Sequence, residues 1–131
     1  MNALDTNALV RFLVNDDEKQ ALAVKKTVLE TEKKGERLFI PLAVILETIW
    51  VLSSVYEHST ENILHALEGL LCVAVFKIDE HDRVSKMCHR AAVQDVDPAD
   101  LIIGLTSLDH GCATTLTFDK KAARSELFTL I

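Results

Sequence analysis

Short apolar runs alternate along this chain with longer segments of helical periodicity, and this alternation restricts the fold more than any other feature. The short runs are Asn2 to Leu4, Arg37 to Ile40, Cys72 to Ile78, Ala113 to Phe118 and Phe128 to Leu130. Each has the length of a strand. Because neighbouring parallel strands need long crossover connections, the order predicts an α/β fold with a mainly parallel sheet covered by helices on both faces.

Helix start and stop signals fit between these runs. Asp17 with Gln20 forms a capping box, Ser59 and Asp79 precede two further helical patterns, and Gly35 and Gly111 are typical helix ends. The expected helices are Asn7 to Leu13, Asp17 to Lys34, Pro41 to Val55, Ser59 to Leu71, Asp79 to Val93 and Pro98 to His110.

The chain has the size of one domain. It contains 131 residues, of which 49% are hydrophobic and only 4 are Gly and 2 are Pro. That composition excludes intrinsic disorder and low-complexity classes, and no linker or repeat divides the sequence. We therefore expect a single domain over residues 1–131.

Charge and cysteine usage indicate the setting. The formal net charge of −6 opposes nonspecific attraction to nucleic acid, so a polyanionic substrate requires help from a cation. Cys72, Cys88 and Cys112 have no metal-binding spacing and are interpreted as buried thiols in a reducing compartment. No signal-like leader or membrane-length apolar stretch is present, so we expect a cytoplasmic protein without a membrane anchor.

Four acidic residues follow predicted strands or a loop at a helix entry. Asp5 follows the first strand, Asp119 follows TLTF, and Asp97 and Asp100 flank the start of a helix at Pro98. Because the carboxyl ends of parallel strands share one edge of a sheet, these carboxylates are expected at the same edge.

Glu47 is the only charged residue between Pro41 and Val55, where almost every face of the predicted helix is apolar. A buried carboxylate without a partner costs several kcal/mol, so Glu47 needs a cation, a basic side chain or a raised pKa. A route to solvent is the alternative. Oxygen ligands alone suit Mg²⁺ or Mn²⁺ better than zinc, and the five histidines are interpreted as surface residues.

The chain resembles the PIN-domain ribonucleases, and within them the VapC-type toxins of prokaryotic toxin–antitoxin pairs. The resemblance rests on LDTNALVRFL, on IPLAVILETIWVL, and on DPADLIIGL followed by TTLTFDKKAA, in that order along nearly the whole chain. It implies an α/β/α sandwich with a central parallel sheet of about five strands.

The resemblance also implies a metal-dependent endoribonuclease. Asp5 and Asp100 would be the principal Mg²⁺ ligands, and Glu47 and Asp119 would complete the acidic cluster. Thr6, Asn7, Asp97 and Thr117 match supporting positions. The implied partners are RNA, a second copy of the chain and a cognate antitoxin protein.

Two further expectations concern surfaces. Arg11, Lys120, Lys121 and Arg124 follow the acidic strand ends and could line an RNA path. The apolar helix Leu42 to Val55, with Trp50 and Tyr56 as anchors, could form a dimer interface.

Three other readings stay open on the sequence. A haloacid-dehalogenase phosphatase also uses a strand-terminal Asp with Mg²⁺ but normally needs a second Asp where this chain has Asn7. A response-regulator receiver needs adjacent acids after its first strand, which are absent. A PIN domain used only for binding is the third, although all four acids are present.

Overall fold

A computed structural model describes all of residues 1–131. Its strands are β1 (Asn2–Ala3), β2 (Leu38–Ile40), β3 (Phe76–Ile78), β4 (Thr115–Thr117) and β5 (Phe128–Leu130). Its helices are α1 (Thr6–Leu13), α2 (Glu18–Lys33), α3 (Leu42–Ser54), α4 (Thr60–Leu71), α5 (His81–Val93) and α6 (Pro98–Asp109), with a short 3₁₀ helix η1 (Ala122–Arg124). The predicted α/β class, with strands that alternate with helices, is confirmed.

Local signals set most helix ends as expected. Asp17 and Ser59 accept hydrogen bonds from Gln20 N and Asn62 N at the starts of α2 and α4. Gly35 and Gly111 end α2 and α6 with φ values of +68° and +85°, a region that favours glycine. Helix ends are therefore determined mainly by nearby residues.

Two caps differ from expectation. Asp5, rather than Asn7, caps α1. Asp79 caps no part of α5, because its Oδ2 accepts a hydrogen bond from Leu42 N at the start of α3 (3.1 Å). Helix α5 instead begins after Glu80, whose φ of 53° lies in the left-handed region. Asp79 thus joins the end of β3 to the start of α3, a tertiary contact that local spacing does not encode.

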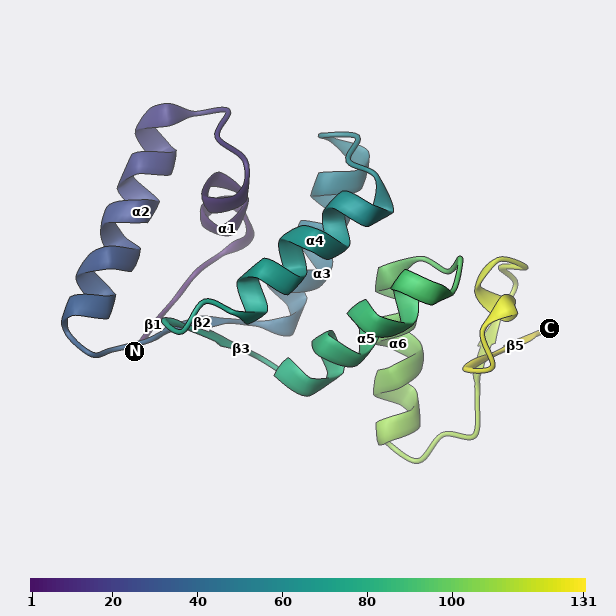
Figure 1. The fold of residues 1–131 in the computed structure, drawn as a ribbon. Helices are drawn as coiled ribbons and strands as arrows, with labels where there is room; N and C mark the ends of the chain where they lie inside the picture. The colour runs from purple at the N-terminus through teal and green to yellow at the C-terminus, as the bar shows by residue number, and fades with distance from the viewer.

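All strand pairs are parallel, but the five strands form two sheets. One sheet has the order β1-β2-β3 and the other contains β4 and β5. Figure 1 shows β1, β2 and β3 at one end of the molecule and β5 at the other, with α5 and α6 between them. The structure therefore differs from the predicted single sheet in that β1 and β4 each have one edge without a strand neighbour.

One continuous core of 26 buried residues joins these parts. Helix α6 contributes Leu101, Ile102 and Leu105, which are almost completely buried. Gly104 faces β5, and a Cβ built on it would lie 2.9 Å from Leu127 Cβ and 3.0 Å from the Phe128 ring. The absence of a side chain at Gly104 is thus what allows β5 to pack this closely on α6.

The cysteines correct one expectation. Only Cys88 is buried, whereas Cys72 and Cys112 are exposed. Burial, with a smaller contribution from the charge of Glu68, raises the pKa of the Cys88 thiol to about 11.

None of the helices is both long enough and apolar enough to cross a bilayer.

Replacing Gly104 with Ala should destabilise the fold. The added methyl group would clash with Leu127 Cβ, which cannot move away without the backbone because it is bonded to the Cα atom. We therefore expect a loss of about 1–3 kcal/mol in the free energy of unfolding. Gly69→Ala in α4 is the matched control, because nothing lies within 4 Å of its Cβ position. That control should gain about 0.5–1 kcal/mol from helix propensity. Urea unfolding of both variants measures this, and equal stabilities would contradict the α6–β5 contact.

Candidate active site

Three of the predicted acids lie near one another at the C-terminal end of the chain. Asp97 caps α6, where its Oδ1 accepts a hydrogen bond from Ala99 N at 2.8 Å. Asp100 stands in the first turn of the same helix and is half-buried. Asp119 follows β4 and lies close enough for its charge to affect Asp100. The structure thus brings Asp97 and Asp119 near Asp100, and a shared role for the three carboxylates stays a prediction.

The pKa of the Asp100 carboxyl is raised. Its partial burial is the largest cause, followed by the negative charges of Asp97 and Asp119, and Lys121 partly opposes them. A carboxylate that is desolvated beside two others is an unfavourable arrangement unless a cation shares the site. Neither Asp5 nor Glu47 is among the charges that act on Asp100.

Asp119 is held by the turn that it begins. Its Oδ1 accepts hydrogen bonds from Lys121 N at 2.8 Å and Ala122 N at 3.3 Å. Its own N–H donates to Thr117 Oγ1 at 2.9 Å. Thr117 therefore holds the backbone of Asp119, and its role as a supporting residue of the site stays a prediction.

Basic residues border this acidic group. Lys121 and Arg124 both pair with Asp95, at 3.6 and 2.9 Å, and all three side chains are largely exposed. Lys120 is exposed. Asp95 was not among the residues predicted for the site. The Asp95-Val96-Asp97 repeat before Pro98 is the signal that could have drawn attention to it.

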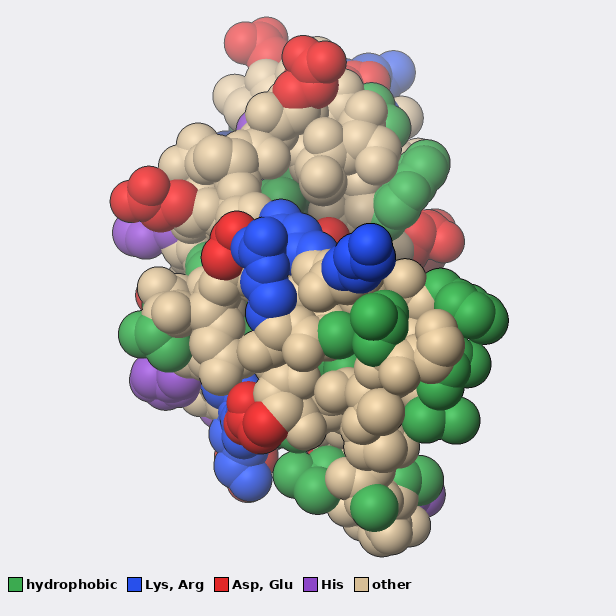
Figure 2. All heavy atoms as spheres, turned by 90° about the vertical axis from the view of Figure 1, so that its right-hand side faces the viewer, with side chains coloured by type: hydrophobic (Ala, Val, Ile, Leu, Met, Phe, Trp, Pro, Cys, Tyr) green, Lys and Arg blue, Asp and Glu red, His purple; other side chains and the backbone are tan.

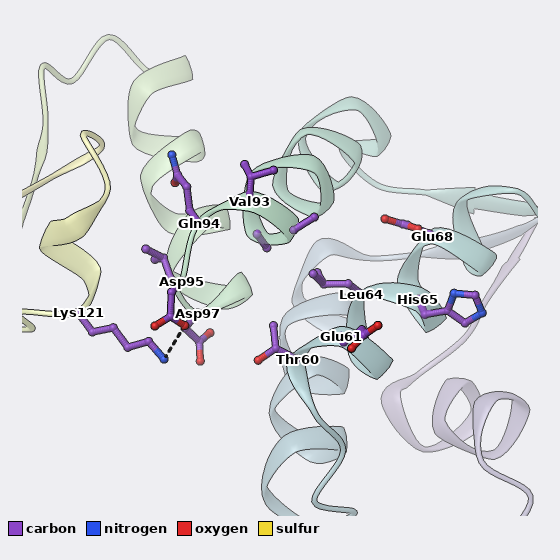
Figure 3. A pocket seen from close by; sticks show the side chains of 13 residues that line it. Thr60, Glu61, Leu64, His65, Glu68, Val93, Gln94, Asp95, Asp97 and Lys121 are labelled. Atoms are coloured by element: carbon purple, nitrogen blue, oxygen red, sulfur yellow. Dashed lines mark ion pairs between the residues drawn. The ribbon is translucent and has the colours of Figure 1, made fainter.

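A cleft of about 660 Å³ opens beside these residues, between α4 and the end of α5. Figure 3 shows Asp95 and Asp97 on one side with Lys121 reaching toward Asp95, and Glu61 of α4 on the other side. The cleft thus borders the acidic group, and four of its eight polar lining side chains are acidic.

The remaining predicted acids belong to the N-terminal part. Asp5 is exposed and caps α1 through a 2.8 Å hydrogen bond from Ala8 N, while Thr6 and Asn7 form the first helical turn. Glu47 lies on α3 and is exposed. Of the two readings that the sequence left open for Glu47, the structure shows the route to solvent, because Ala43, Glu47 and Trp50 form a stripe of α3 that no other element covers.

The acids therefore form two groups rather than one. No set of three acidic, histidine or cysteine side chains converges closely enough to hold a metal ion. Their oxygen donors have the right chemistry for Mg²⁺ or Mn²⁺, but the arrangement within one chain does not fit a metal bound by Asp5, Glu47, Asp100 and Asp119 together.

Arg11 and Tyr56 have a structural role. Arg11 donates hydrogen bonds to Gln20 Oε1 (2.7 Å), Asp16 Oδ1 (3.1 Å) and Tyr56 Oη (3.0 Å). The Tyr56 hydroxyl in turn donates to Asp16 Oδ2 at 2.7 Å. This network joins α1, the start of α2 and the end of α3, so the Tyr56 hydroxyl already has partners within the chain.

Removing that hydroxyl should weaken the network in a pH-dependent way. The hydrogen bond from Tyr56 is the largest cause that lowers the pKa of Asp16 below its ordinary 3.8. The stabilisation of the fold by this hydrogen bond is therefore complete above the ordinary pKa of Asp16. It is lost as the pH falls through the lowered pKa of Asp16 in the folded protein. We expect Tyr56→Phe to reduce the melting temperature at about pH 7 and to have less effect at about pH 3. The Asp16 pKa, measured by NMR titration, should rise in this variant.

A double-variant cycle provides the control. Tyr56→Phe should cost less stability when Asp16 is already Asn, because the two side chains act through one interaction. Additive effects at about pH 7 would contradict the network.

Two comparisons with known proteins give matches. The family model described as "PIN domain" matches residues 3–126. Over 79 residues the chain is 33% identical to a protein named VapC ribonuclease from Aquifex aeolicus (strain VF5), and the match covers 60% of this chain and 58% of that relative. A family match over nearly the whole length disfavours the phosphatase and receiver readings. The chain belongs to the PIN-domain family.

Proposed function

We propose that this protein is a metal-dependent endoribonuclease that hydrolyses RNA phosphodiester bonds, and that it is the toxin of a toxin–antitoxin pair. The observation that carries the proposal is the half-buried Asp100 at the start of α6, beside Asp97 and Asp119. Family membership and the likeness to a VapC ribonuclease support it. The match spans 58% of the length of that relative, so its activity is carried over here as a proposal.

Residues 1–131 act as one nuclease domain in this proposal, and the continuous core supports that view. Asp5 and Asp100 are the proposed main ligands of Mg²⁺ or Mn²⁺, with Glu47 and Asp119 completing the acidic set, and because one chain holds these acids in two separate groups, the proposal requires a rearrangement or a second copy to bring them together. Thr6, Asn7, Asp97 and Thr117 have supporting roles, and the cap at Asp97 and the Thr117–Asp119 contact are consistent with them.

RNA is the proposed substrate, and the basic side chains at the C-terminal end are its proposed contacts. Lys121 and Arg124 pair only with exposed Asp95, and such surface pairs contribute about 0–1 kcal/mol. A phosphate can replace Asp95 at little cost, and exposed Lys120 adds a third cation. Arg11 is less suited to this task because its guanidinium already has three partners.

The two other proposed partners, an antitoxin and a second copy of the chain, are proposed from the family to which the chain belongs. A cognate antitoxin would cover the acidic site, and a second copy of the chain would form a homodimer. The cytoplasm, where cellular RNA is found, is the proposed site of action.

Cleavage of RNA by the purified protein tests the proposal. We expect cleavage with Mg²⁺ or Mn²⁺, loss of cleavage with EDTA, and a decrease of about 100-fold or more in Asp100→Asn. Asp82→Asn is the matched control, because this α5 carboxylate is 99% exposed and away from the site. It should cleave like the unchanged protein.

Other outcomes would count against the nuclease. Release of phosphate from small phosphoesters with intact RNA would favour a phosphatase. RNA binding without cleavage at any metal concentration would favour a PIN domain that only binds.

A further inference from the structure

The two sheets end in unpaired edges that are complementary to each other. Leu4 N donates to Phe39 O on β2, so the backbone groups of Ala3 face the opposite, open edge of β1 by the alternation of a strand. Thr115 N donates to Leu127 O and Ile131 N to Thr117 O, so both threonines face β5. The backbone groups of Leu116 therefore face the open edge of β4.

From these edges we propose that two copies of the chain exchange their C-terminal strands. The open edge of β1 in one copy pairs in parallel with the open edge of β4 in the other. Each exchange creates one five-stranded sheet from β1, β2 and β3 of one copy and β4 and β5 of its partner. Two such sheets form in one dimer.

The exchange also completes the acidic site. Asp5 lies two residues beyond Ala3, and Asp119 lies two residues beyond Thr117, so parallel pairing brings both to the same edge of the joined sheet. Asp100 accompanies Asp119, since their carboxylates already interact. Each active site then takes Asp5 and Glu47 from one copy and Asp100 and Asp119 from the other. This part rests on the proposed nuclease function.

A second copy fits the open edge of β1 better than the chain's own β4 does. Helix α6 contacts β5 at Gly104, where even a Cβ atom would lie too close to Leu127 and Phe128. Helix α6 also packs on α5 and α3. Helix α5 packs on α4 in turn. These contacts keep β4 and β5 at the far end from β1 (Figure 1), so pairing within one chain would have to break them. A partner can supply the strand without disturbing any of them.

The exposed area agrees with a missing partner. The chain exposes 7785 Å², whereas a folded monomer of this mass exposes about 6,900 Å². The excess of about 900 Å² is close to the roughly 800 Å² that each partner buries in a stable interface.

The composition of the edges points the same way. Monomeric proteins protect an edge strand by keeping it very short or with Lys, Pro or a bulge; β1 and β4 are short, but neither contains Lys or Pro. Leu116 and Phe118 are 61% and 81% exposed at β4. Figure 2 looks at this end of the molecule and shows uncovered hydrophobic side chains beside a basic group. Reciprocal exchange between two copies closes the assembly and covers both edges.

The first test is the molar mass in solution. Light scattering after size exclusion should give twice the chain mass of 14.6 kDa at micromolar concentration. Leu116→Pro removes the N–H at the open edge of β4 and keeps the hydrogen bonds to β5, so it should shift the protein to monomer. Leu130→Pro is the matched control, because its N–H lies on the outer edge of β5, and it should stay dimeric.

The second test mixes two variants that are inactive alone. Asp5→Asn keeps the helix cap, and Asp119→Asn keeps an acceptor for its turn. Co-refolded in equal amounts, they should recover about a quarter of the wild-type cleavage rate, because half of the dimers are mixed and each has one intact site of two. Asp100→Asn mixed with Asp119→Asn should recover nothing, since both changes lie in the same exchanged part.

The outcomes separate the two proposals. A monomeric wild-type protein that cleaves RNA, or a cleaving dimer whose Asp5→Asn and Asp119→Asn mixture stays inactive, would overturn the exchange and leave the nuclease standing. A dimer that Leu116→Pro dissociates and that cleaves no RNA would overturn the nuclease and leave the strand exchange.

Discussion

The packing of β5 on α6 at Gly104 determines where the second half of the site lies. The backbone of α6 and the side chains of Leu127 and Phe128 approach so closely that no side chain fits between them. Three-residue strands such as β4 and β5 have little stability as an isolated pair. Their position therefore depends on α6, and Asp119 at the end of β4 depends on it in turn. Because Asp100 belongs to the same helix, one contact fixes both carboxylates.

The electrostatics follow from this placement. A chain of net charge −6 brings Asp97, Asp100 and Asp119 together, and the partial burial of Asp100 increases the cost of its charge. Lys121 offsets only part of this cost, since it also pairs with Asp95. Such an arrangement opposes folding unless a positive group compensates it, which is the physical basis for the proposal that these carboxylates serve a ligand. The exposed cations beside them give a polyanion a place to approach despite the net charge.

Features that depend on nearby residues could be predicted from the sequence. Capping by Asp17 and Ser59, the stops at Gly35 and Gly111, and the existence of every strand require only local spacing and residue type. The proximity of Asp97 and Asp100 also needs only local spacing, whereas the common-edge argument that expected Asp5 beside Asp119 failed because β1 and β4 lie in different sheets.

Features that depend on distant partners could not be predicted in this way. The bond from Asp79 to α3 joins residues 37 positions apart, and the Arg11–Tyr56 contact joins residues 45 apart. The exposure of Glu47 depends on which stripe of an apolar helix remains uncovered, and the amphipathic pattern of α3 is too weak to show it. The division of the sheet is of the same kind, since a two-residue β1 carries no local signal for its neighbour.

In the proposed strand exchange, the activity of the proposed nuclease would depend on the association of two copies. Where one chain supplies Asp5 and Glu47 and another supplies Asp100 and Asp119, the number of complete sites depends on association rather than on folding alone. A dilute chain would be folded and inactive, and a ligand that occupies the open edge of β1 or β4 would prevent assembly of the site without touching a carboxylate. The unprotected edges would then be part of the control of the activity, because the same backbone groups that complete the sheet also decide whether the acids meet.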